Sequence, residues 1–168
     1  MIQIEWKNIK KDVDKQTYRL ATIHIDDAHA DIRDRMQEDD TISSIRFIAR
    51  FCLEGIALVR TAIKDVLIDT SGLDTSDDLL ATDQAVWQFE IKKGDEGVCC
   101  TLIHKALVDY ILWRWCLLWL PNYAASFNAE YVSAVQAIQN EVFRLDWCAK
   151  EKRPEAPINK DECKIAYQ

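Results

Sequence analysis

Residues 99–120 read CCTLIHKALVDYILWRWCLLWL, and the rest of the chain has to accommodate this stretch. It is apolar on almost every face and holds three of the six tryptophans, so a helix formed from it must be covered by other segments. A membrane span needs about 20 uninterrupted apolar residues. Four polar side chains interrupt this run: His104, Lys105, Asp109 and Arg114. We therefore predict a buried helix of a soluble protein, and no membrane partner.

The composition of the 168-residue chain is that of a folded and mainly helical domain. Apolar residues make up 49% and charged residues 29%, which excludes a disordered chain. Only four glycines and three prolines are present, few for a β protein with many turns. We predict one helical domain over residues 1–148. A polar tail over residues 149–168 holds two of the prolines.

The acidic balance of the chain argues against nucleic acid as its main partner. The formal net charge is −7 and the isoelectric point is about 5.0. Proteins that grip phosphate backbones usually carry a basic face. We therefore expect no nucleic acid partner, although a local basic patch is compatible with this charge.

The cysteines indicate a reducing compartment. None of the six forms a CxxC pair, and Cys52 and Cys116 fall inside apolar helical patterns. The first 15 residues lack the apolar core of a signal peptide. Together these features predict a cytoplasmic protein with free thiols.

Two segments before the central stretch have helical periodicity. Residues 8–21 predict a short N-terminal helix with Ile9, Val13 and Leu20 on one face. Residues 42–67 predict a long helix with one continuous apolar stripe, and the mid-helix Gly55 suggests a close approach of another helix. The stripe consists of Ile45, Ile48, Cys52, Ile56, Val59, Ile63 and Val66.

A helical hairpin is predicted around Pro121. Proline disfavours helical geometry in the residue before it, so the central helix should end at Leu120. Asn122 or Ser126 can cap the next helix, and the short link makes the two helices antiparallel neighbours. The seam of that next helix steps by four and three residues: Tyr131, Val135, Ile138, Val142 and Leu145.

Two segments alternate apolar and polar residues, which is typical of strands. They are residues 2–6 and 86–92, and we predict that they pair in a sheet of two or three strands. Residues 21–25, ATIHI, are an alternative strand, which leaves the end of the first helix open. Residues 26–40 are rich in acidic residues and predict a short exposed helical turn followed by a loop, and residues 69–84 predict a long loop.

The segment HIDDAH is the one cluster with the chemistry of metal ligands: His24, Asp26, Asp27 and His29. The five-residue step between its histidines does not place them on one helical face, as HExxH does. A solvated acidic segment is the competing interpretation. We predict no metal and no cofactor.

A second chemical pair is Cys100 and His104, one helical turn apart. A catalytic thiol also needs an orienting group and an exposed, electropositive environment, and the flanking residues here are apolar. No glycine-rich phosphate loop and no GxSxG turn occurs. We therefore predict that the protein is not an enzyme and takes no small-molecule substrate.

The tryptophans of the central stretch predict an interface. A two-residue step turns a helix by about 200°, so Trp113, Trp115 and Trp119 cannot all face one way. An apolar, aromatic surface on a small protein is usually an interface. Asp109 and Arg114 either mark a helix edge that reaches solvent or pair with a partner subunit. These five residues are the candidate interface.

The order of segments resembles that of a group of phage proteins. A strand (AVWQFEI), a glycine-containing turn, a helix with YILWRW, Pro-Asn and a helix beginning YAASFNAEYVSAV follow one another. IEWKNIKKDVDKQT and DDTISSIRFIARFCLEGI precede them. This rhythm is similar to that of small prophage-encoded head–tail proteins of gut bacteria. The resemblance lies in pattern and a few aromatics, so it carries over no functional residue. It implies a virion or virion-assembly component at the neck or tail.

We therefore predict a mainly α protein: three long helices in a bundle, a shorter N-terminal helix, and a two- or three-stranded sheet. The predicted function is that of a structural or assembly protein that associates with itself or with other structural proteins, in the cytoplasm or the virion. One alternative is a cytoplasmic helical adaptor or regulatory module. A second is a metal-dependent enzyme that uses the segment from His24 to His29.

Overall fold

The computed structural model describes the backbone of residues 1–24, 42–68 and 84–150, and the side chains of residues 1–23, 48–68 and 84–143. A mainly α fold with a small β element is confirmed. The elements follow one another as β1 (Ile2–Glu5), α1 (Trp6–His24), α3 (Ile42–Ala62), the 3-10 turn η2 (Lys64–Val66), β2 (Val86–Phe89), α5 (Glu96–Trp119) and α6 (Pro121–Lys150).

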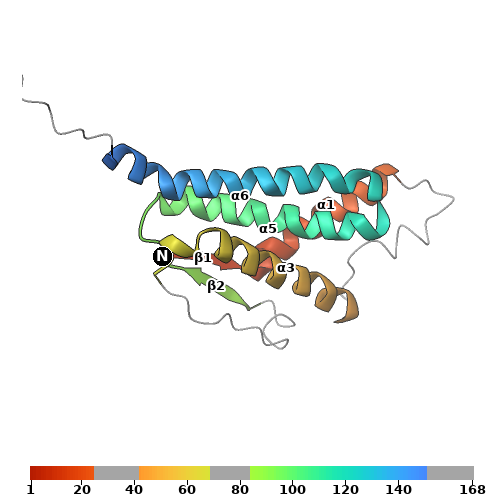
Figure 1. Cartoon of the computed structure of the whole chain (residues 1–168). Helices are drawn as coiled ribbons and strands as arrows, with labels where there is room; N and C mark the ends of the chain where they lie inside the picture. The colour runs from red at the N-terminus through yellow and green to blue at the C-terminus, as the bar shows by residue number, and fades with distance from the viewer. Residues whose placement is uncertain (25–41, 69–83, 151–168) are drawn as a thin grey trace, which may run out of the picture.

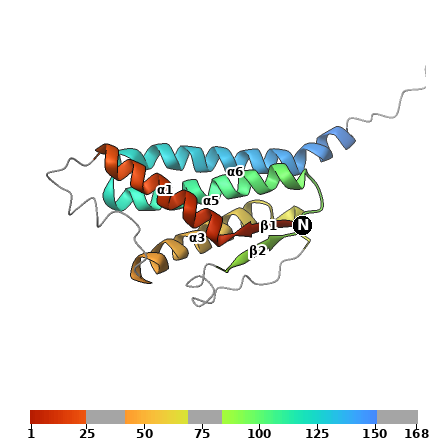
Figure 2. The ribbon, with the colours of Figure 1, turned by 180° about the vertical axis from the view of Figure 1, so that it is seen from behind.

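Helix α5 lies at the centre of the fold. It contacts α6, α3, α1 and β1, and Figure 1 shows it between α6 and α3. Figure 2, from behind, shows α1 crossing α5 on the side away from α3. Because these neighbours cover α5 on several sides, its buried side chains are distributed around most of the helix. The buried residues of α5 are Cys99, Ile103, Ala106, Leu107, Val108, Asp109, Tyr110, Ile111, Leu112, Trp115 and Cys116.

The start of α5 differs from the prediction. The helix begins at Glu96, and the carboxylate of Asp95 caps it by accepting a hydrogen bond of 2.9 Å from the backbone N–H of Val98. The N–H of Leu120 closes the other end on the carbonyl of Cys116 at 2.8 Å. The predicted end at residue 120 is therefore correct to within one residue.

Helix α6 confirms the predicted hairpin. It begins at Pro121, which fits the first helical turn because no hydrogen-bond donor is needed there. Asn122 and Ser126, the two predicted caps, lie inside the helix, so that prediction was wrong. Of the predicted seam, Ile138 and Val142 are buried. Tyr131 and Val135 are partly buried against the core, and the side chain of Leu145 lies outside the described residues.

Helix α3 packs the described part of its apolar stripe against the core around α5, and it ends at Ala62 rather than at residue 67. The predicted close approach at Gly55 is confirmed. A Cβ atom at Gly55 would lie 3.1 Å from Leu107 Cδ2 and 3.1 Å from Tyr110 Cδ1, both on α5. The space beside this glycine is thus filled by side chains of the central helix.

The two predicted strands pair antiparallel as β1 and β2, with Ile2 opposite Phe89 and Ile4 opposite Trp87. Strand β2 stops at Phe89, and Ile91 forms only an isolated bridge with Leu67. The side chains of these two opposed pairs are all buried, so the sheet closes one side of the core. The alternation of residues 2–6 therefore identified the buried face correctly.

Helix α1 is longer than predicted at both ends. It starts at Trp6, inside the expected strand, and runs to His24. The alternative strand over residues 21–25 is wrong for 21–24, because these residues continue the helix and Ala21 is fully buried in the fold. Tertiary packing here outweighs the β propensity of the segment.

The predicted loops 26–40 and 69–84 lie outside the described residues, apart from residue 84. Residues 149 and 150 of the predicted tail belong to α6, and the remaining tail residues also lie outside.

Candidate functional site

The three tryptophans of α5 have different environments. Trp115 is only 2% exposed, whereas Trp119 is 43% exposed. The exposure of Trp113 is intermediate, and its side chain packs against the main core. Its ring stacks on Tyr131 of α6 with centroids 6.4 Å apart and meets the edge of Tyr110 at 5.5 Å. Of the three, Trp119 is therefore the one that presents a largely free surface.

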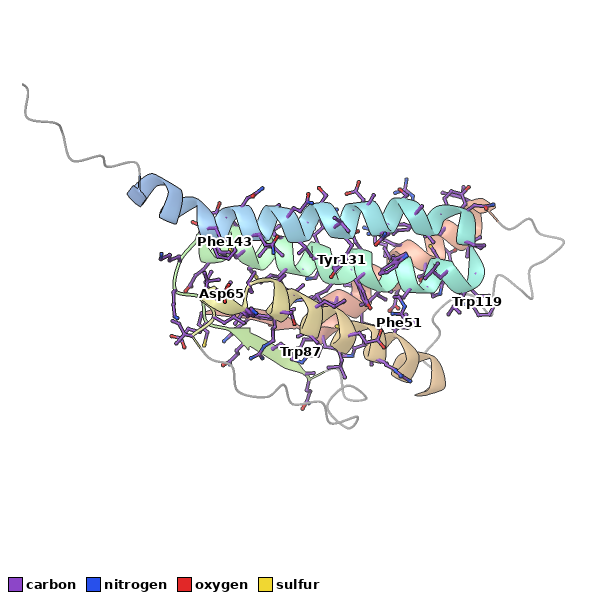
Figure 3. The ribbon with its side chains drawn as sticks, in the orientation of Figure 1. Phe51, Asp65, Trp87, Trp119, Tyr131 and Phe143 are labelled. Atoms are coloured by element: carbon purple, nitrogen blue, oxygen red, sulfur yellow. The ribbon has the colours of Figure 1, made fainter. Side chains whose placement is uncertain are left out.

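Trp119 belongs to a group of exposed apolar side chains where α5 turns into α6. Leu117, Leu118 and Trp119 form the last turn of α5, and Tyr123 stands in the first turn of α6. Their exposed fractions are 50%, 55%, 43% and 37%. We call these four residues the apolar corner. Figure 3 shows Trp119 at this end of the hairpin, far from Phe143.

A small separate hydrophobic core lies next to the apolar corner. Trp115, Cys116 and Ala124 are buried together, and partly buried apolar side chains from α1, α5 and α6 pack around them. One of these is Leu20, near the C-terminal end of α1. Figures 1 and 2 both show α1 ending beside the turn between α5 and α6. The corner therefore rests on packed structure contributed by three helices.

The surface that continues from the corner along α6 carries little charge. Residues 115–129 contain no charged residue at all, and Glu130 is the first. Glu130 is the one charged residue among the exposed residues of α6 up to residue 140, whereas exposed surfaces are usually about a quarter to a third charged. The other exposed residues of this stretch are Pro121, Asn122, Tyr123, Ala125, Ser126, Ala129, Val132, Ser133, Gln136 and Asn140.

Asp109 lies on the core side of the hairpin and is paired within the chain. Its carboxylate is 2.7 Å from Lys105 Nζ, one helical turn away, and Lys105 also donates to Glu130 of α6 at 2.8 Å. Burial raises the pKa of Asp109, against the opposing effect of Lys105. Burial lowers the pKa of Lys105, but its hydrogen bonds to the two carboxylates outweigh that effect and leave this pKa raised. The lysine in turn lowers the pKa of Glu130.

Arg114 is also paired within the chain. Its Nη1 donates to Glu54 Oε2 of α3 and to the hydroxyl oxygen of Tyr110, both at 3.0 Å. The guanidinium also lies over the ring of Phe51, 4.8 Å from the centroid. Asp109 and Arg114, two of the five candidate interface residues, thus direct their charges to α3, α5 and α6 of the same chain.

A cavity of about 330 Å³ lies between β1, the start of α1 and α5. His104 lines it, and its Nε2 is 2.8 Å from Asp12 Oδ2 on α1, which supplies an orienting carboxylate that the sequence did not reveal. The Cys100 thiol lines the same cavity, but it donates to the backbone carbonyl of Gln3 at 3.6 Å. The thiol is therefore directed to the backbone of β1, and Cys100 with His104 does not form a nucleophile–base pair here.

The buried thiols of the described residues are poor nucleophiles. Burial, helped by Glu141 and Asp95, raises the pKa of Cys99 to about 11. Burial alone raises the pKa of Cys116 to about 11 and that of Cys52 further still. At neutral pH these side chains act as small apolar groups in the core.

The HIDDAH segment lies outside the described residues, apart from the backbone of His24. Where the structure describes side chains, no group of three or more histidine, cysteine or acidic residues is placed to hold a metal ion. None of the described helices is long and apolar enough to cross a membrane. Comparison with known protein families, with curated proteins and with solved structures finds no match for this chain.

Proposed function

We propose that this protein is a non-enzymatic assembly protein that associates with a second copy of itself through the apolar corner. The observation that carries the proposal is the exposure of Leu117, Leu118 and Trp119 on a single helical turn. Single exposed apolar residues are normal on a surface, but three consecutive exposed apolar residues at one end of a helix, one of them aromatic, favour an interface. Aromatic residues at the centre of an interface contribute most of the binding energy.

The absence of charge from residues 115–129 supports a second copy as the partner. Two copies with a formal net charge of −7 repel each other over most approaches. The uncharged run of residues 115–129 offers an approach on which this repulsion is weakest. Two-fold symmetry is the commonest symmetry of homodimers. A two-fold axis through the apolar corner would place Trp119 of each copy against the apolar corner of the other.

The outward side of α6 extends the proposed contact. Its small side chains, such as Ala125, Ala129 and Ser133, are spaced four residues apart and exposed. Small residues allow two helices to approach closely, so α6 of each copy can lie along the other beyond the corner. A stable interface buries roughly 800 Å² per partner, more than four side chains supply, so this extension is part of the proposal.

The resemblance in segment order to prophage head–tail proteins gives the proposal a setting. In it, self-association builds or joins a ring or collar of the virion, and the chain contributes contacts rather than chemistry. If the setting is right, the protein sediments with assembled particles when its genetic neighbours are expressed together. The corner is proposed independently of this setting.

The experiment is a measurement of molar mass in solution by light scattering and by sedimentation, from micromolar to near-millimolar concentration. Wild-type protein should form a dimer or a larger closed assembly, and Leu118→Glu should be a monomer over the same range, because it buries a charge in the contact. Leu58→Glu is the matched control. Leu58 is a leucine of α3 with 45% exposure, close to the 55% of Leu118, and its change should leave the assembly intact.

A strictly monomeric wild-type protein at every concentration would overturn self-association and favour the adaptor function. A wild-type dimer that Leu118→Glu does not dissociate would place the contact away from the corner. Circular dichroism of both variants checks that neither substitution unfolds the bundle.

A further inference from the structure

Helix α1 is basic within an acidic protein. It holds five lysine or arginine residues and two aspartates, while the whole chain has a formal net charge of −7. Four of the five cations, Lys7, Lys11, Lys15 and Arg19, are exposed and follow one another in steps of four. We call these four residues the basic row. With a rise of about 1.5 Å per residue, successive cations stand about 6 Å apart along the helix.

The basic row takes no part in the ion pairs seen among the described residues, which involve other cations such as Lys105, Arg114 and Arg50. Figure 2 shows α1 in front of α5, with its outer side turned away from the bundle and no described helix over it. Like charges at four-residue spacing repel each other, which slightly destabilises the helix. Their repulsion is relieved when an anionic partner binds.

A groove of about 490 Å³ runs along the second half of α1 beside the row. Lys15 and Arg19 line it together with two apolar side chains, Leu20 and Ile23. Ile23 is 61% exposed, the highest exposed fraction among the large apolar side chains of the described residues. The groove therefore combines two cations with an apolar surface that is exposed to water.

We propose that the outer side of α1 is the docking site for an acidic, amphipathic helix of a partner protein. Carboxylates at every fourth position of such a helix also repeat at about 6 Å, so they match the spacing of the basic row. Leucine-type side chains on its adjacent face cover Leu20 and Ile23. Complementary charge sets the register and the rate of association, and the apolar contact contributes affinity.

The same observations favour a protein over a nucleic acid. Phosphate groups bind cations but leave Ile23, and the part of Leu20 that the small core does not cover, without an apolar contact. The carboxylate of Asp12 also lines the groove, where it is already held by His104. In addition, the cations form a single row on one helix, whereas a duplex presents two phosphate strands to a protein surface.

The test uses the full chain and a fluorescent synthetic peptide that carries glutamate at every fourth position and leucine on the neighbouring helical face. Binding is followed by anisotropy at several salt concentrations. Wild-type protein should bind this peptide, and affinity should fall as salt screens the charges. Lys11→Glu/Lys15→Glu should weaken binding at least about tenfold, since two attractive charge pairs become repulsive.

Three controls separate the alternatives. Lys64→Glu/Lys92→Glu makes the same change in net charge at exposed lysines away from α1 and should leave binding within a factor of about two. A peptide of the same composition in scrambled order should bind more weakly than the patterned one. A short single-stranded oligonucleotide should compete poorly for the site.

Several outcomes would overturn the proposal. Tighter binding of the oligonucleotide would assign the basic row to nucleic acid. Equal loss in both double variants would mean that only overall charge matters. Binding that appears only after the acidic residues of 26–40 are changed to their amides would assign the row to the chain's own sequence. No binding to any probe would leave the row a solvated face.

Discussion

Arg114 Nη1 lies 3.0 Å from Glu54 Oε2, and this contact ties the central helix α5 to α3. The same carboxylate also faces Arg50, 3.6 Å away within α3, but the side chain of Arg50 is 80% exposed. The two arginines therefore share one acceptor under different conditions of burial. This pair of arginines provides a matched experiment on what a charged contact contributes.

We expect Arg114→Met to lower the free energy of unfolding by about 1–2 kcal/mol, because Glu54 and Tyr110 lose a half-buried donor. Arg50→Met should change it by no more than about 0.5 kcal/mol, as is usual for exposed pairs. Urea denaturation followed by tryptophan fluorescence measures both. If both variants lose the same free energy of unfolding, the contact from Arg114 of α5 to Glu54 of α3 contributes no more than the exposed contact of Arg50.

Gly55 gives a second prediction, about packing. A larger side chain there meets Leu107 and Tyr110, so Gly55→Leu should destabilise the protein by about 1–3 kcal/mol through overpacking. Ala57, two residues on, is exposed, and Ala57→Leu should stay within about 0.5 kcal/mol of wild type. Thermal and urea denaturation provide the comparison. If both leucines are tolerated equally, α3 does not approach α5 closely at this glycine.

Local periodicity was sufficient to predict most of the fold. The alternation of Ile2 and Ile4 against Trp87 and Phe89 identified which faces of the strands are buried, because a strand has a period of two whatever surrounds it. The proline at 121 located the hairpin for an equally local reason. Element ends were harder. The segment beginning at Ala21 has the composition of a strand, but packing of α1 on the bundle keeps it helical.

The candidate sites were less accessible from sequence, because they depend on contacts between distant residues. The helical step showed that Trp113 and Trp115 differ in direction. Trp115 and Trp119 are one helical turn apart on nearly the same face, so only the position at which the bundle ends decides that the first is covered and the second is exposed. The partner of His104 is Asp12, 92 positions away, so no spacing rule reveals it. The basic row of α1 is present in the sequence as a four-residue repeat, but the net charge of the whole chain, −7, does not show that cations are concentrated on one helix.

The cysteines give a third prediction. Cys100 lines a cavity and is half-buried, whereas Cys52, Cys99 and Cys116 are buried with raised pKa values. At about pH 8, a thiol with a pKa near 11 is roughly one part in a thousand thiolate. Of these four, Cys100 should therefore be alkylated first by iodoacetamide, as fragment masses after digestion would show. Labelling in urea should remove the difference, and early labelling of Cys52 in native protein would contradict the burial of α3 against the core.

The last prediction concerns Lys105 and its two carboxylates, whose pKa values shift in opposite directions. Burial raises the pKa of Asp109, so the folded protein binds more protons at this group than the unfolded chain does. The contribution of Asp109 to the free energy of unfolding therefore falls as the pH rises above about 4. The pKa of Glu130 is lowered by Lys105, so its contribution is present above the ordinary glutamate pKa and is lost as the pH falls through the folded value.

Asp109→Asn and Glu130→Gln each remove one of these titrations and keep the shape of the side chain. From about pH 3 to 7, the stability of wild type relative to Asp109→Asn should decline, and that relative to Glu130→Gln should rise and then level off. Urea denaturation at a series of pH values measures both differences. Because the two carboxylates share the same lysine, a common trend in both variants could not come from burial of Asp109. Opposite slopes would instead locate that burial on the α5 side of the hairpin, with Glu130 left in solvent.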